Sequence, residues 1–277
     1  FCEHYLHEVT ELNDLYESRD SPDAQLSDVI DRFSEDWPQI SHAQAWASKN
    51  DPVACAAFAV RGETLLRYRA NGQVRVAWFR AALEAYPRIH ETHAFQKYEW
   101  LQEQARTARP DRLFGVLFAP NSAVALAGDI SKREILLGLG ESLSDTGHAS
   151  EALVVLSAAL KERVEDDRLV IDQGGTRRLE WKRTGTTVAT RAMNSLGLAS
   201  YRNRNYRVAH RWFLKGLAEA RRRDDTYMEA VVLANMAMLK AELHDVDEAV
   251  TLHLRSLELV SSRSYWELMG NQFGNLG

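Results

Sequence analysis

The chain has 277 residues and a formal net charge of −5. This length allows one large or two ordinary domains with an ample core, and the negative charge gives no reason to expect nucleic-acid binding. No stretch is long and apolar enough to predict a membrane-spanning helix, and nothing resembles a signal peptide. The two cysteines, Cys2 and Cys55, lack the spacing of metal ligands, so we expect a cytoplasmic protein with reduced thiols.

Residues 1–86 predict a series of helices without an internal repeat. Apolar residues recur at helical spacing in "HYLHEVTELNDLY", and "RDSPDAQ" then interrupts the pattern. A second helical stretch contains "WPQI" at residues 37–40 and "AWA" at residues 45–47, and a helix pair that breaks at Asn71-Gly72 follows it. The residues that mark this pair are Tyr68, Gly72, Trp78, Phe79, Ala82 and Leu83.

The second half contains a motif that recurs every 40 residues. Leu196-Gly197 is followed at this interval by Met236-Ala237 and Leu276-Gly277, and an earlier copy, Leu139-Gly140, precedes the series by 57 residues. A fixed period of this size indicates a solenoid built of helix pairs. The 17 additional residues before the second copy belong to an insertion at residues 163–187.

Each complete copy carries a small residue at three equivalent positions. Small side chains at these places would allow the two helices of a pair to approach closely, because larger ones would hold the backbones apart. The nine residues are Gly140, Ala152 and Ala159, then Gly197, Ala209 and Gly216, then Ala237, Ala249 and Ser256. We expect the turns within the pairs at residues 145–148, 202–205 and 244–245, with Gly147 in a left-handed conformation.

The small-residue pattern resembles that of the tetratricopeptide repeat (TPR), with a longer period. The resemblance implies an all-α fold, a right-handed superhelical solenoid of antiparallel helix pairs. We expect residues 1–110 to form a helical arm, and residues 111–277 to form a TPR-like domain that ends at the start of a further repeat.

The order of motifs in residues 1–86, followed by the repeats, resembles the region after the nucleotide-binding module of bacterial STAND signalling ATPases, relatives of NB-ARC proteins. "HYL", "WPQI" with "AWA", and the Tyr68 to Leu83 segment carry this resemblance. It implies a non-catalytic sensor fragment that binds a protein or peptide inducer. It also implies contact with the nucleotide-binding domain of the same polypeptide and a contribution to its autoinhibition.

Motifs for catalysis or cofactor binding are weak or missing in the sequence. There is no P-loop, and Gly138-Leu139-Gly140 lacks the third glycine of a dinucleotide fingerprint. His90-Glu91-Thr92-His93 is one residue too short for a zinc-protease helix, and Cys55 lies in an apolar run typical of a buried thiol. We therefore expect no enzyme activity, no cofactor and no metal.

We expect the inducer to bind the concave face, which the first helix of each repeat lines in a superhelical stack. A ladder of Asn235 and Asn275 would bond the backbone of an extended peptide, and Arg191 or Arg202 would pair with a carboxylate. Alternatively, the Asn residues hold the repeat geometry. The candidate residues are Arg191, Asn194, Leu198, Tyr201, Arg202, Asn235, Met238, Asn271 and Asn275, with Ser195, Glu134, Glu141 and Ser144 at equivalent positions.

The insertion at residues 163–187 is charged and contains an isolated Trp181 close to Arg178. Long loops in compact arrays often carry function. These two residues are candidates for an interdomain or inducer contact, and the alternative is that Trp181 packs against a neighbouring helix. For the whole chain, the alternative to a STAND sensor is a stand-alone TPR adaptor that binds peptide tails.

Overall fold

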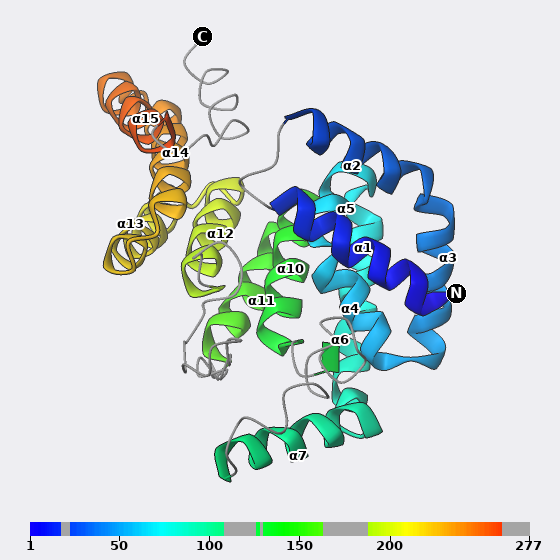
Figure 1. Cartoon of the computed structure of the whole chain (residues 1–277). Coiled ribbons are helices and arrows are strands. Elements are labelled where there is room, and N and C mark those ends of the chain that lie inside the picture. Colours follow the sequence, from blue (N-terminus) through cyan, green and yellow to red (C-terminus); the bar gives the residue numbers. More distant parts are fainter. Residues whose placement is uncertain (18–22, 108–125, 128–129, 163–187, 262–277) are drawn as a thin grey trace. The chain divides into compact units, whose positions relative to one another are not determined.

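The computed structural model describes residues 1–17, 23–107, 126–127, 130–162 and 188–261, and these residues form helices and turns without any strand (Figure 1). The prediction of an all-α fold is confirmed. The helices are α1 (Cys2–Glu17), α2 (Asp23–Glu35), α3 (Trp37–Asn50), α4 (Pro52–Arg61), α5 (Glu63–Arg69), α6 (Gly72–Ile89), α7 (His93–Thr107), α10 (Lys132–Asp145), α11 (Ala149–Lys161), α12 (Val188–Arg202), α13 (Tyr206–Arg222), α14 (Thr226–Glu242) and α15 (Val246–Ser261).

The chain divides into two compact units. Of the described residues, the first unit comprises those from 1 to 142 together with residue 162, and the second comprises residues 143–161 and 188–261. Each unit has its own buried core, and the two are described separately below.

Helix α4 lies at the centre of the first unit. It packs against α1, α3 and α6, and every residue from Val53 to Val60 is buried. Its start follows from local chemistry, because the Asp51 carboxylate accepts hydrogen bonds from the backbone N–H groups of Val53 and Ala54, and Pro52 occupies the first helical position. Cys55 is fully buried within this helix, as its apolar surroundings in the sequence predicted.

The motifs that carry the STAND resemblance pack against one another in the first unit. The indole rings of Trp37 and Trp78 stack with their centroids 5.6 Å apart, and the guanidinium of Arg69 lies 5.8 Å from the Trp37 ring centroid. Trp37 begins α3 and Trp78 lies in α6, so the stack joins two segments that are 41 residues apart in the sequence.

The second unit stacks helices in chain order. Helix α12 packs against α11 and α13, and α14 packs against α13 and α15 (Figure 1). Helix α12 also contacts α14, so the first helices of two consecutive pairs are neighbours. The three predicted turns are confirmed, since α10, α12 and α14 end at Asp145, Arg202 and Glu242.

All nine small residues of the repeat pattern are buried. Gly197 shows why the position must be small, because a Cβ atom built on it would lie 2.3 Å from Cε1 of Phe213 on the next helix. Phe213 is itself completely buried, so its ring has no room to move aside. The aromatic ring therefore fills the place that a side chain at position 197 would occupy.

The turns of the second unit share one backbone geometry. Gly147, Arg204 and His244 occupy the same place in the three copies and all have positive φ, at 84°, 56° and 60°. After each of them, the next N–H bonds a carbonyl five residues earlier, as in His148 to Leu143 and in the bonds from Asn205 and Asp245. This is the hydrogen bond of the Schellman motif, which satisfies a carbonyl that the helix end leaves open.

Candidate protein-binding site

The face shared by α12 and α14 contains a pair of amides, whereas the predicted ladder of Asn235 and Asn275 includes a residue outside the described ones. The side-chain Nδ2 of Asn235 donates a hydrogen bond of 2.8 Å to Oδ1 of Asn194. Asn194 is buried and Asn235 is half-buried. The bond joins one helix pair to the next, which supports the structural role considered for Asn235. Among the described residues, nothing else bonds the Asn235 amide, which retains an oxygen acceptor and one N–H donor.

Tyr201 lies at the C-terminal end of α12 and is half-buried against the hydrophobic core of the unit. Its ring centroid lies 5.7 Å from that of Tyr206, whose hydroxyl donates a hydrogen bond of 2.9 Å to Oε1 of Glu242. Burial and the Glu242 charge raise the pKa of Tyr201, and the hydrogen bond to Glu242 raises that of Tyr206. The phenol of Tyr201 therefore stays protonated at neutral pH and remains available as a donor, whereas the hydroxyl hydrogen of Tyr206 is already bonded to Glu242.

Arg202 is engaged by the turn of the preceding repeat. Its Nη1 donates to Oγ of Ser144 at 2.6 Å and to Oδ1 of Asp145 at 2.9 Å. These bonds hold the end of α12 against the turn before α11. An inducer carboxylate at Arg202 would therefore have to share the guanidinium with Asp145.

The other candidate residues have varied surroundings. Leu198 is half-buried and packs against the core cluster of α13 and α14, and Arg191 and Met238 are half-buried. Four candidates lie outside the described residues, namely Arg178, Trp181, Asn271 and Asn275.

The equivalent positions of the first copy are occupied by internal contacts. The Glu134 carboxylate accepts hydrogen bonds from the backbone and hydroxyl groups of Ser131 and caps α10, while Glu141 forms an ion pair with Arg67 in the first unit. Ser144 accepts the hydrogen bond from Arg202, and Ser195 of the second copy is buried in α12. The carboxylates of Glu134 and Glu141 are therefore already engaged by other residues of the chain.

The weak motifs have structural explanations. A Cβ atom on Gly138 would lie 2.2 Å from Cζ of Phe79, so this glycine of the Gly-x-Gly sequence allows α10 to pack on α6. His90 and His93 are exposed, and the His90 ring lies edge-on to Phe95 with centroids 4.3 Å apart. Over the described ranges, no three or more His, Cys, Asp or Glu side chains gather as metal ligands would.

Sequence reasoning missed Glu242 and the role of Tyr206 at this face. The hydroxyl of Tyr206 reaches a carboxylate on α14. The two residues are 36 apart in the sequence, which falls short of the 40-residue period. The contact therefore does not join equivalent positions of two repeats.

Comparisons with known proteins leave the function open. No protein-family model and no curated protein matches the chain. Among solved structures it is similar to the crystal structure of BtubC (BKLC) from P. vanneervenii, with a TM-score of 0.47 and 16% identity over 84% of this chain and 74% of that one. A likeness this distant carries no argument about what the chain does. None of the described helices is both long and apolar enough to cross a membrane.

Proposed function

We propose that the chain is a non-catalytic sensor segment whose second unit binds an extended stretch of an inducer protein along the face shared by α12 and α14. The observation that carries this proposal is the half-buried Asn235, which Asn194 holds in a fixed orientation by one hydrogen bond. An oriented amide with an acceptor and a donor left is suited to bond the backbone of an extended peptide.

The surroundings of Asn235 suit such a ligand. Met238 lies three residues further along α14 and is half-buried, so it would contact a side chain of the peptide. Tyr201 would supply both apolar area and a hydroxyl donor. This combination of a flexible thioether, an aromatic ring and an amide is common at peptide-binding surfaces.

The wider context that we propose is a STAND-type signalling ATPase, with the first unit as its arm. The order of motifs in residues 1–86 supports this context, and so does the Trp37–Trp78 stack that joins two of those motifs. In this arrangement the ATPase would lie in another part of the polypeptide. A stand-alone TPR adaptor would use the same face without a nucleotide switch.

Site-specific photocrosslinking tests the binding face. Benzoylphenylalanine placed at Met238 is expected to crosslink to a protein partner in cells, and Asn235→Ala is expected to abolish the crosslink. The matched control places the crosslinker at Glu151, an exposed position on α11. A crosslink that persists in the Asn235→Ala chain, or that forms equally from position 151, would show that the partner does not bind at this face.

Two further observations separate the contexts. A P-loop and a winged helix encoded upstream of Phe1 would support the STAND sensor, whereas a start codon directly before Phe1 would support the adaptor. In both contexts the purified chain is expected to hydrolyse no ATP. Measurable turnover that is proportional to the concentration of the chain would contradict both.

A further inference from the structure

Helix α13 exposes a row of cations that the rest of the described chain does not neutralise. Arg207, Arg211 and Lys215 follow one another at four-residue intervals, and all three are exposed. Four-residue spacing places them on one side of the helix over about 12 Å. No carboxylate of the described residues pairs with any of them. We call these three residues the cationic ridge.

The basic residues at the end of the same helix are different. Arg222 and Arg223 both pair with Glu219, and Arg221 pairs with Glu229 at 2.8 Å. Among the arginines and lysines of α13 and its C-terminal cap, the lack of a carboxylate partner within the described residues is therefore confined to the ridge. Like charges at four-residue spacing destabilise an isolated helix. Carboxylates from a partner would turn this cost into attraction.

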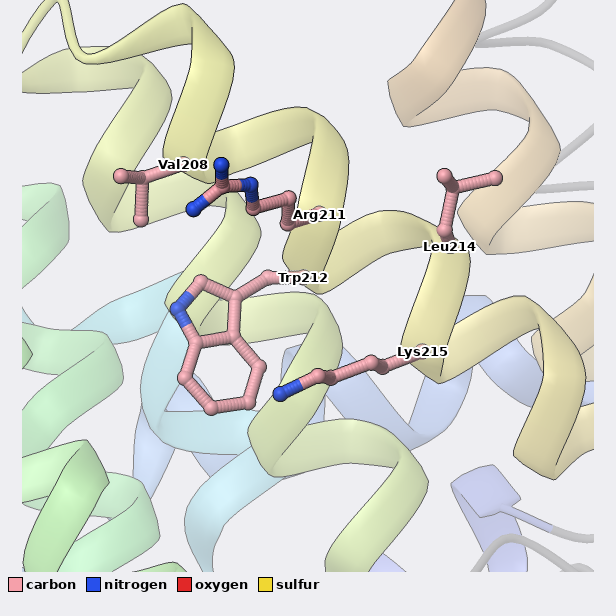
Figure 2. A pocket seen from close by; sticks show the side chains of 5 residues that line it. All are labelled: Val208, Arg211, Trp212, Leu214 and Lys215. Atoms are coloured by element: carbon pink, nitrogen blue, oxygen red, sulfur yellow. The ribbon is translucent and has the colours of Figure 1, made fainter.

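Apolar side chains flank the ridge on both sides. Val208 and Trp212 lie along one side, and Leu214, which is 46% exposed, lies along the other. The Lys215 ammonium nitrogen lies 4.5 Å from the centroid of the Trp212 ring, and Figure 2 shows this amine directed toward the six-membered ring. Together with Arg211, these residues line a groove of about 350 Å³. The groove has room for a few side chains of a partner.

We propose that this exposed face of α13 binds an acidic, partly apolar segment of a partner protein. Carboxylates of the segment would pair with the cationic ridge, and an aromatic or aliphatic side chain would enter the groove beside Trp212. Tryptophan and arginine are the residues that most often dominate the energy of protein interfaces. The surface is separate from the face shared by α12 and α14, and the inference does not rest on the function proposed above.

Charge and area favour an acidic peptide over other anionic partners. The chain carries a net charge of −5, so its overall field repels a polyanion such as RNA, whereas a short segment senses mainly the local ridge within a Debye length of about 8 Å. An anionic membrane would require a broad apolar face, and here only Leu214 is exposed beside two half-buried side chains.

The equivalent surface one repeat later supports the choice of α13. Leu254 and Arg255 lie 40 residues after Leu214 and Lys215, and both are exposed. However, Arg255 lies 3.9 Å from Glu229, and Glu258 lines the same groove. That surface is therefore partly neutralised by its own carboxylates, whereas the row on α13 is not neutralised by any described carboxylate.

Peptide selection tests the proposal. Random 12-residue peptides displayed on phage would be selected on the immobilised chain, with counter-selection on the double charge reversal Arg211→Glu/Lys215→Glu. The expected peptides carry at least two carboxylates beside an aromatic or aliphatic residue. In fluorescence anisotropy they are expected to bind the reversed variant at least tenfold more weakly, and to bind the unaltered chain more weakly as salt rises.

The matched control reverses two cations outside the face, as Lys49→Glu/Lys161→Glu, and changes the net charge by the same amount. Both residues are exposed, and this variant is expected to bind the selected peptides like the unaltered chain. Circular dichroism of both variants checks that the helices are retained. Selected peptides that bind the Arg211→Glu/Lys215→Glu variant equally well would overturn the proposal. Ridge-dependent binding to phosphatidylserine vesicles or to single-stranded RNA, without any acidic peptide, would also overturn it.

Discussion

Phe213 lies directly on the backbone of Gly197, so that its ring occupies the volume of a side chain at that position. A Cβ atom on residue 197 would lie 2.3 and 2.4 Å from two carbons of the ring. Because Phe213 is fully buried, Gly197→Ala forces either the ring to shift or the two helices to move apart. We expect a loss of about 2–3 kcal/mol in the free energy of unfolding, measured by urea denaturation of the whole chain.

Gly216 provides the matched control for this substitution. It is also a buried helical glycine of the repeat pattern, but a Cβ atom there would meet its nearest neighbours at 3.6 Å, which is ordinary van der Waals contact. Gly216→Ala is therefore expected to be neutral or to stabilise by up to about 1 kcal/mol, because alanine favours the helix. Equal losses at both positions would show that the Phe213 ring is not the cause.

The amide pair between Asn194 and Asn235 predicts a measurable coupling. Asn235→Ala removes the donor to Oδ1 of Asn194, which is buried and would then lack its partner. We expect a cost of about 1–2 kcal/mol in the free energy of unfolding. A double-mutant cycle with Asn194→Ala should show that the second substitution costs less once the first is present. Additive losses would indicate that the two amides act independently.

The sequence predicted the packing of the repeats better than their contacts. The small residues at positions 140, 197 and 237 were recognised because helix packing limits side-chain volume at fixed intervals, and their burial confirms the reasoning. The partner of Asn235 was not predicted, because Asn194 lies 41 residues away and therefore at a different place in its repeat. Side-chain contacts between repeats follow three-dimensional geometry, which the period alone does not fix.

Two other features of the fold depend on contacts between residues that are far apart in the sequence. At Gly62, between α4 and α5, a Cβ atom would lie 2.8 Å from Cγ1 of Val9, so a residue on α1 leaves no space for a side chain there. Arg202 bonds Ser144 and Asp145, from which the insertion at residues 163–187 separates it in the sequence. A local sequence pattern does not indicate contacts between residues that lie so far apart in the sequence.

The shared turn geometry predicts that two residues are conformationally strained. Arg204 and His244 adopt left-handed φ values of 56° and 60°, which cost most residues other than glycine about 1 kcal/mol or more. Arg204→Gly and His244→Gly are each expected to stabilise the protein by about 0.5–1 kcal/mol in thermal or chemical unfolding.

Gly147 supplies the converse test. Its φ is 84°, and nothing lies within 4 Å of a Cβ atom built on it, so Gly147→Ala introduces backbone strain without a steric clash. We expect this variant to lose about 1 kcal/mol. A loss of stability in the two glycine variants, or an unchanged Gly147→Ala chain, would argue against strain at these turns.

The Glu219 ion pairs predict a pH dependence. Hydrogen bonds from Arg222, and then from Arg223, lower the pKa of Glu219 from 4.5 to about 2. Since the folded pKa lies below the unfolded one, the pairs stabilise the fold above pH 4.5, and this contribution is lost as pH falls from 4.5 toward 2. Glu219→Gln should therefore cost up to about 1 kcal/mol at pH 7, and the difference should shrink over this window.

The control for Glu219 is Asp28→Asn. Asp28 is exposed and forms no ion pair with the described residues. Its substitution should leave the free energy of unfolding unchanged at pH 7 and pH 3. If Glu219→Gln cost as much at pH 3 as at pH 7, the effect would come from packing rather than from charge.

The two thiols are expected to react slowly in the native protein. Burial raises the pKa of both Cys2 and Cys55 to about 11, so only about one thiol in a thousand is ionised at pH 8. Cys2 is partly accessible and should be alkylated by iodoacetamide at a rate that rises with pH, whereas the fully buried Cys55 should react only when the first unit unfolds. Comparison with the Cys2→Ser and Cys55→Ser variants shows which cysteine carries each alkylation detected by mass spectrometry. Rapid labelling of Cys55 in native buffer would show that α4 is not the stable centre of its unit.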